Sequence, residues 1–243
     1  MFRAKDQALP RLKSQPNKVR RTARRHPRRF PGIDLPLQNP PTILPFRGIS
    51  PDIAGDAFIA PNVSIIGDVR IGAGSSIWYG CTVRGDVNKV RIGKGSNLQD
   101  NSVIHVDSRT FPTVVGDDVL IGHQCLIHGC TIGDGVTIGM QSCLMDGVVV
   151  EPYAMVAAGS LVTPGKVIPS GQIWAGRPAK FMQEMDMATV EARVEGTRYY
   201  ARLAQEHKAM IEAVHAAAAS VERSAEPDEI QGPMVGGRPW EGP

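Results

Sequence analysis

The sequence predicts an all-β solenoid, a parallel β-helix of hexapeptide repeats, followed by a C-terminal α-helix. The first observation is an aliphatic residue at every sixth position over residues 59–83 and, after a step of nine, over residues 92–104. After a step of ten the series continues over residues 114–168. A period of six fits neither the 3.6-residue helix nor simple strand alternation. It is typical of a solenoid in which each six residues form a short strand and a turn.

The repeat predicts which side chains point into the solenoid. The eighteen inward positions are Ile59, Ile65, Ile71, Ile77, Val83, Ile92, Leu98, Ile104, Val114, Leu120, Leu126, Ile132, Ile138, Leu144, Val150, Val156, Val162 and Ile168. With three repeats in each coil they form about six coils, from about residue 55 to 172, stabilised by stacking on one another. The two longer steps, after Val83 and after Ile104, predict inserted loops of three and four extra residues.

Composition supplies the second observation. The chain has 26 glycines and only 5% aromatic residues, which favours short strands joined by turns over a helical bundle. No apolar run approaches the ~18 residues that a membrane span needs.

The third observation is a helical pattern at residues 186–222, where apolar residues recur at steps of three and four. Gly196 is a weak point in that pattern, so one helix or two helical pieces would fit it.

Charge and composition divide the chain further. Residues 1–42 form a basic, proline-rich arm that we expect to be disordered, 43–180 the β-helix, 181–222 the helical segment and 223–243 a disordered tail. Residues 1–30 hold eleven Lys and Arg and one acid. Such an arm is compatible with a mitochondrial transit peptide, with electrostatic binding to an anionic surface or, as we prefer, with a solvated tail. We therefore expect a cytoplasmic protein, with a mitochondrial one as the alternative, and no nucleic-acid partner.

Three of the six histidines lie in the interrupted part of the repeat. His105 follows Ile104 by one position, and His128 follows Leu126 by two. Both are therefore expected on the same face of adjacent coils, about 4.8 Å apart. None of the three histidines occupies an inward position, so their side chains are predicted to point outward, where they can bind a metal.

Polar residues surround this pair in the predicted register. Arg84 and Asp86 lie one coil below it on the same face, and Gln99 and Asp100 lie one coil below His123. His123 itself falls near a corner, from which it would meet the pair of another chain if solenoids pack side by side. Three converging histidines favour a metal site. A zinc finger is excluded because the cysteines form no CxxC pattern, and they are expected to be small apolar fillers.

Four segments resemble the gamma-class carbonic anhydrases. They are IWYGCTVRGDV (77–87), NLQDNSVIHVD (97–107), IGHQCLIHGCTIGDGVTIGM (121–140) and AAGSLVTPGK (157–166). The resemblance covers roughly residues 43–215. It implies a left-handed β-helix, an exception to the usual crossover hand, and a homotrimer with metal sites at the subunit interfaces.

The resemblance also implies a role for each site residue. His105 and His128 of one chain and His123 of the next would hold Zn²⁺, with Fe²⁺ or Co²⁺ as other metals. The remaining assignments are Arg84 and Asp86 to an interface ion pair, Gln99 and Asp100 to polar groups beside the reacting water, and Tyr200 to a helix tyrosine near the site. Zinc in such a site lowers the pKa of bound water to about 7, and the resulting hydroxide converts CO₂ to bicarbonate.

One departure from the family keeps two other functions open. The best-characterised members carry an acidic proton carrier after RGD and another on a long acidic loop, whereas Val87 follows RGD here and the segment before His123 is short. A catalytically weak metal-binding scaffold subunit is therefore one alternative. A hexapeptide acyltransferase, which uses a single histidine as general base, is the other.

Overall fold

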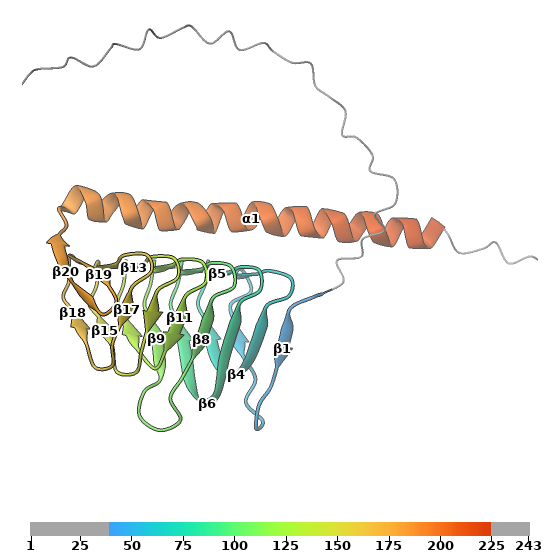
Figure 1. The fold of residues 1–243 in the computed structure, drawn as a ribbon. Coiled ribbons are helices and arrows are strands. Elements are labelled where there is room, and N and C mark those ends of the chain that lie inside the picture. The colour runs from blue at the N-terminus through green and yellow to red at the C-terminus, as the bar shows by residue number, and fades with distance from the viewer. Residues whose placement is uncertain (1–38, 225–243) are drawn as a thin grey trace, which may run out of the picture. The chain divides into compact units, whose positions relative to one another are not determined.

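The computed structural model describes residues 39–224, with side chains described to residue 217. It confirms the predicted fold class: a left-handed parallel β-helix followed by one C-terminal helix (Figure 1). The basic stretch at residues 1–30 and nearly all of the predicted C-terminal tail lie outside the described residues. Within the described part, no helix is long and apolar enough to cross a membrane.

One face of the solenoid, the helix face, is a sheet of seven parallel strands. In order along the sheet they are β3 (Phe58–Ile59), β5 (Ser76–Ile77), β7 (Asn97–Leu98), β10 (Leu120–Ile121), β13 (Thr137–Ile138), β16 (Met155–Val156) and β19 (Gln172–Gly176). Seven coils therefore replace the six expected from the sequence. Antiparallel pairing of β20 (Ala179–Glu184) with β19 ends the sheet.

The other two faces are joined into one sheet by long strands. The histidine face contains β8 (Val103–His105), β11 (Leu126–His128), β14 (Cys143–Leu144) and β17 (Leu161–Val162). The third face contains β9 (Thr113–Val115), β12 (Thr131–Ile132), β15 (Val149–Val150) and β18 (Val167–Ile168). Strands β4 (Ser64–Ile71) and β6 (Thr82–Ile92) pass from one of these faces to the other, and β1 (Thr42–Leu44) and β2 (Asp52–Ile53) pair with β4.

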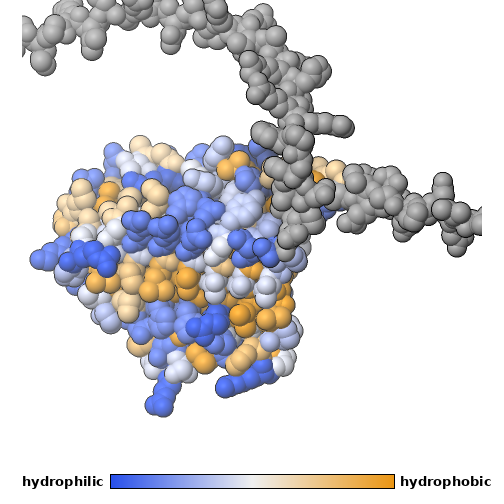
Figure 2. All heavy atoms as spheres, turned by 45° about the vertical axis from the view of Figure 1, so that its right-hand side comes forward, coloured by the Kyte–Doolittle hydropathy of each residue, from blue (hydrophilic) through white to orange (hydrophobic). Residues whose placement is uncertain are grey.

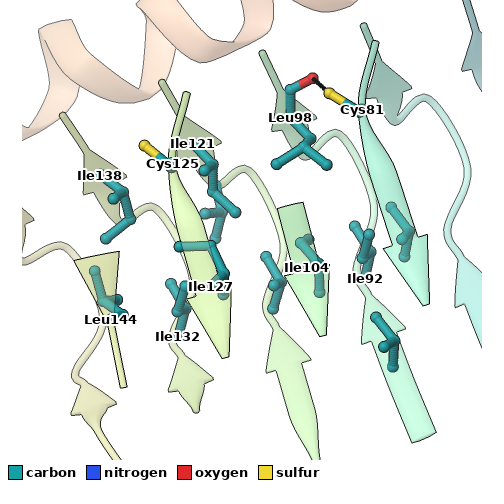
Figure 3. Close-up of a cluster of buried hydrophobic side chains, with 14 of the residues drawn as sticks. Cys81, Ile92, Leu98, Ile104, Ile121, Cys125, Ile127, Ile132, Ile138 and Leu144 are labelled. Carbon is teal, nitrogen blue, oxygen red and sulfur yellow. Dashed lines mark hydrogen bonds between the residues drawn. The ribbon is translucent and has the colours of Figure 1, made fainter. Parts of the chain in front are cut away.

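The core is a stack of aliphatic side chains, and it corrects part of the predicted register. Ile121 and Ile127 point inward and are buried, as Figure 3 shows, whereas Leu126 is 39% exposed. Val115 is likewise buried where Val114 was predicted to be. Successive strand residues point to opposite faces, so an error of one residue reverses inside and outside.

The inward positions Val114, Leu120 and Leu126 were therefore wrong by one residue. The true series runs from Ile104 to Val115, a step of eleven, and then through Ile121 to Ile127. A step of five to Ile132 restores the predicted series. The sequence pattern misled because aliphatic residues stand side by side at 114–115, 120–121 and 126–127, and both choices keep a period of six.

The three extra residues predicted after Val83 are present, because four residues of β6 (86–89) stand opposite one residue of β4 between the pairs Gly67–Gly85 and Val69–Val90. They form a bulge and not a loop between two strands, since β6 continues as one strand of 11 residues. It pairs with β4 on both sides of an irregularity between Gly67 and Val69. Gly67 has a φ of +79°, and a Cβ on it would lie 2.4 Å from the carbonyl oxygen of Gly85. Glycine at this point therefore lets the two long strands approach each other closely while they turn the corner.

The helix α1 (Met187–Ser224) is continuous through Gly196 and runs along the helix face (Figure 1). Its most extensive strand contacts are with β3, β5 and β7. Up to residue 217, its buried positions are Val190, Thr197 and Ala204, seven residues apart. Tyr79 and His207 join solenoid and helix through a hydrogen bond of 3.0 Å between the Tyr79 hydroxyl and His207 Nδ1.

Candidate functional site

Two histidines stack in register on the histidine face. His105 ends β8 and His128 ends β11, and the two residues are direct partners in the parallel pairing of these strands. Each follows a fully buried isoleucine, so each points outward. Their ring centroids are 5.1 Å apart, and His105 Nδ1 lies 3.2 Å from His128 Nε2.

The spacing of these two nitrogens fits a shared metal. Zinc–nitrogen bonds of 2.0–2.1 Å at a tetrahedral angle separate two ligand nitrogens by about 3.3 Å. The opposite nitrogen of each ring contacts a carboxylate: His105 Nε2 lies 3.0 Å from Asp86 Oδ1, and His128 Nδ1 lies 2.5 Å from Asp146 Oδ1. A carboxylate behind a histidine is the usual way of fixing its tautomer for metal binding.

Asp86 connects His105 to Arg84, its partner in the ion pair that the family resemblance implied. Arg84 Nη1 donates a hydrogen bond to Asp86 Oδ2, and the other carboxylate oxygen contacts His105. Burial on its own raises the pKa of Asp86, but the hydrogen bonds from Arg84 and His105 and the Arg84 charge hold it below its usual value. Asp86 is therefore an anion that faces His105.

Asp146 is a residue that the sequence reasoning missed. It follows β14 at the position in register with Gly129, one coil beyond His128. The available signal was the coil length: Asp146 comes eighteen residues after His128, as Asp86 comes nineteen before His105. A search for acids one coil away from each histidine would have found both.

His123 lies apart from this pair, at the corner between the helix face and the histidine face. Its Nδ1 is 2.8 Å from Asp100 Oδ2, so it too has a carboxylate behind it. The side chain is 44% exposed, which leaves Nε2 accessible from outside. Among residues 39–224 no three His, Cys, Asp or Glu side chains of one chain are grouped to hold a metal.

Gln99 and Tyr200 lie beside His123 in one pocket of about 270 Å³. Gln99 is buried on β7's side of the corner, and its Nε2 donates to Asn97 Oδ1 at 2.7 Å. Its Oε1 accepts no hydrogen bond from any described residue. Tyr200 reaches the pocket from α1, and its ring packs edge-on against Trp78. Met140 and Met155 contribute to the apolar part of the pocket wall.

The four cysteines are separate from these groups. Cys81, Cys125 and Cys130 are buried and Cys143 is half-buried, all as free thiols. Burial raises the pKa values of Cys81 and Cys130 to about 12, so both stay protonated near neutral pH. They fill space as small apolar residues, in agreement with the sequence prediction.

Comparison with known proteins gives the chain its relatives. The family model described as dynactin subunit 5 matches residues 62–206. Gamma carbonic anhydrase 2, mitochondrial, of Arabidopsis thaliana is 50% identical over 163 residues, which are 65% of this chain but only 59% of that protein. A carbonic anhydrase of Geobacillus kaustophilus is 40% identical over 69% of this chain and 92% of its own length.

A solved structure is also similar to this chain. The crystal structure of a hexapeptide transferase family protein from Anaplasma phagocytophilum has 45% sequence identity and a TM-score of 0.65, and covers 68% of this chain and 97% of that one. The solenoid from β4 to β20, the two paired histidines and the third at the corner all lie inside the matched family region. The chain belongs both to the family that the dynactin subunit 5 model describes and to the gamma-class carbonic anhydrase-like family.

Proposed function

We propose that this protein is a gamma-type carbonic anhydrase, which hydrates CO₂ to bicarbonate at metal sites between the subunits of a homotrimer. The observation that supports it most is the pair of nitrogens, His105 Nδ1 and His128 Nε2, 3.2 Å apart with a carboxylate behind each ring. His123 of a neighbouring copy supplies the third imidazole. Zn²⁺ is the metal that suits three imidazoles best, with Fe²⁺ or Co²⁺ as other candidates.

When bound, such a metal makes a water molecule acidic enough to give hydroxide near neutral pH. The protein's own residues hold the reactants around it. The amide nitrogen of Gln99 donates to Asn97, so Gln99 Oε1 is left to accept a hydrogen bond from the O–H of the reacting water and to orient it. Asp100 fixes His123, and Tyr200 and the two methionines form an apolar wall suited to CO₂.

The surface beside the histidine pair suits contact with a second copy. Val103 and Leu126 are direct neighbours in the pairing of β8 and β11, and they are 37% and 39% exposed. Cys143 and Leu161 continue the same outward column. Figure 2 shows apolar side chains gathered in a band across one face of the molecule. An apolar column next to incomplete metal ligands favours an interface that completes the site.

The names of relatives bear on location and on the other candidate functions. The plant relative's name includes the word mitochondrial, which favours the mitochondrial alternative over the cytoplasmic one. A fluorescent protein fused to residues 1–42 tests this: mitochondrial import supports the mitochondrial location, and diffuse cytoplasmic fluorescence supports the cytoplasmic one.

The transferase name of the Anaplasma protein keeps an acyltransferase as the second candidate.

The decisive experiment combines metal analysis, sedimentation and stopped-flow CO₂ hydration on the same purified chain. We expect one metal ion for each chain, a trimer and a hydration rate that depends on the metal. A metal-free protein that transfers an acyl group from a thioester would instead establish the acyltransferase. A metal-loaded trimer without hydration activity at any buffer concentration would leave the scaffold function.

A further inference from the structure

We propose that Asp146 is a positioning residue for the metal, which holds the ring of His128 in its ligating tautomer. The inference rests on the proposed function, because it assigns a role toward the metal that His128 would bind. The Asp146 carboxylate and His128 come from adjacent coils, and Asp146 Oδ1 lies 2.5 Å from His128 Nδ1. His128 Nε2, on the other side of the ring, faces His105.

The local backbone makes room for this contact. Gly129 has a φ of +54°, and a Cβ built on it would lie 2.3 Å from Asp146 Oδ1. The carboxylate therefore occupies the space that a side chain at position 129 would fill. Phe111, from the loop at residues 106–112, lies against both Gly129 and Gly147 and covers the two residues that follow His128 and Asp146.

A purely structural role would require other partners. Aspartates that only stabilise turns in this solenoid accept backbone N–H groups: Asp117 Oδ1 accepts the N–H of Lys94 at 2.7 Å, and Asp134 Oδ1 accepts the N–H of Asp117 at 2.8 Å. The carboxylate of Asp146 accepts no backbone N–H in the described part of the chain. Its hydrogen-bond partner is His128.

The chemistry of imidazole explains what the contact does. With its Nδ1–H donated to a carboxylate, neutral His128 carries its lone pair on Nε2, the nitrogen directed at the shared position. The negative charge behind the ring also makes Nε2 a better donor to a cation. Loss of such an outer partner typically weakens metal binding by about 10–100-fold.

The test compares Asp146→Ala and Asp146→Asn with the unmodified protein and with Asp134→Ala. Asp134 is a matched control, because its Oδ1 also lies over a glycine of the preceding coil, 2.2 Å from a Cβ built on Gly116, yet it contacts no histidine. Zinc affinity is measured by chelator competition, and the Co²⁺-loaded proteins are compared by visible absorption. Thermal unfolding of the metal-free proteins reports stability separately.

We expect Asp146→Ala to lose about 10–100-fold in zinc affinity and to change the Co²⁺ spectrum. Asp146→Asn keeps an acceptor oxygen without the charge and has almost the same shape. Its zinc affinity should lie between those of the unmodified protein and Asp146→Ala. Equal zinc affinity for the unmodified protein and both Asp146 variants would overturn the inference but leave the proposed function intact. Equal losses in Asp134→Ala would overturn it too, whereas an unmodified protein that binds no zinc would refute the proposed function itself.

Discussion

The coils at residues 132–168 and those at residues 83–127 share one core but differ in their outer surfaces. In the first region every inward residue follows the last by six, and the strands from β12 to β18 have two residues each. In the second region steps of nine and eleven interrupt the steps of six, and a step of five leads from Ile127 to Ile132. There β6 has 11 residues, and β8 and β11 have three. The extra third residue of β8 and of β11 is a histidine.

The difference shows how this fold gains a site without losing stability. Buried aliphatic side chains continue through both regions, so the interruptions leave the stacking energy in place. What they change is the outward surface, where longer strands carry His105 and His128 in one column and Asp86 in contact with His105. Asp146 comes from the first coil of the regular region, so the site lies where the two regions meet.

The largest expected effect comes from removing a proposed metal ligand in the interrupted region. His105→Ala should lower zinc affinity by more than about 100-fold, because two imidazoles and water make a weak zinc site and because ligands outweigh their outer partners. His215→Ala, an exposed histidine on α1, serves as the control and should bind zinc normally. Zinc content after dialysis measures both, and a full complement of zinc in His105→Ala would show that the ligands are elsewhere.

The next effect tests the corrected register in the interrupted region. Val115→Ala removes a buried side chain and should lower the free energy of unfolding by about 2 kcal/mol, whereas Val114→Ala next to it should cost less than about 1 kcal/mol. Val150→Ala, fully buried in the regular region, should match Val115→Ala. Denaturant unfolding compares the three. If Val114→Ala were the costlier of the neighbours, the original register would be right.

This pair of valines also shows how far the sequence could predict the fold. The period of six predicted a hexapeptide solenoid, because a core in which coils stack on one another requires an aliphatic residue at one position in six. The left-handedness was predicted from the family resemblance. The register failed only where two aliphatic residues are adjacent, as at Val114 and Val115, since hydropathy alone cannot tell which one points inward. The step of five before Ile132 compensates the error, so nothing downstream revealed it.

The candidate site was predictable in part for the same reason. His105 and His128 were expected together because coil counting tolerates an error of one residue along a strand, and the structure brings them together. Asp146 was missed because it lies two residues beyond a regular strand, where no motif singles it out. The hydrogen bond from Gln99 to Asn97 depends on side-chain conformations, which a repeat pattern does not contain.

A smaller effect separates metal binding from catalysis. Gln99→Ala should leave zinc content near normal but lower kcat for CO₂ hydration by about 10–100-fold, because it removes a group that orients the reacting oxygen rather than a ligand. Gln205→Ala, on the exposed side of α1, is the control and should change neither quantity. Zinc loss in Gln99→Ala that parallels the loss of activity would mean that Gln99 supports the metal site instead.

The smallest effect concerns the proton that each turnover must release. Val87 lies on β6 one residue after Asp86, which contacts His105, and is 40% exposed, so an acid placed there would be open to solvent next to a residue of the site. The unmodified protein offers no carboxylate at this position, and its hydration rate should therefore rise several-fold with the concentration of a non-coordinating buffer that accepts the proton. Val87→Glu should be faster than the unmodified protein at low buffer concentration and respond less to added buffer.

Val87→Ala separates the added carboxylate from the loss of the valine side chain, and it should keep the buffer dependence of the unmodified protein. Stopped-flow rates across a buffer series, at fixed pH and ionic strength, compare the three proteins. A rate that is independent of buffer in the unmodified protein would show that another group already carries the proton. Asp107, the acid nearest in sequence to His105, already accepts the N–H groups of Arg109 and Thr110 through Oδ2, so it is poorly placed to be that group.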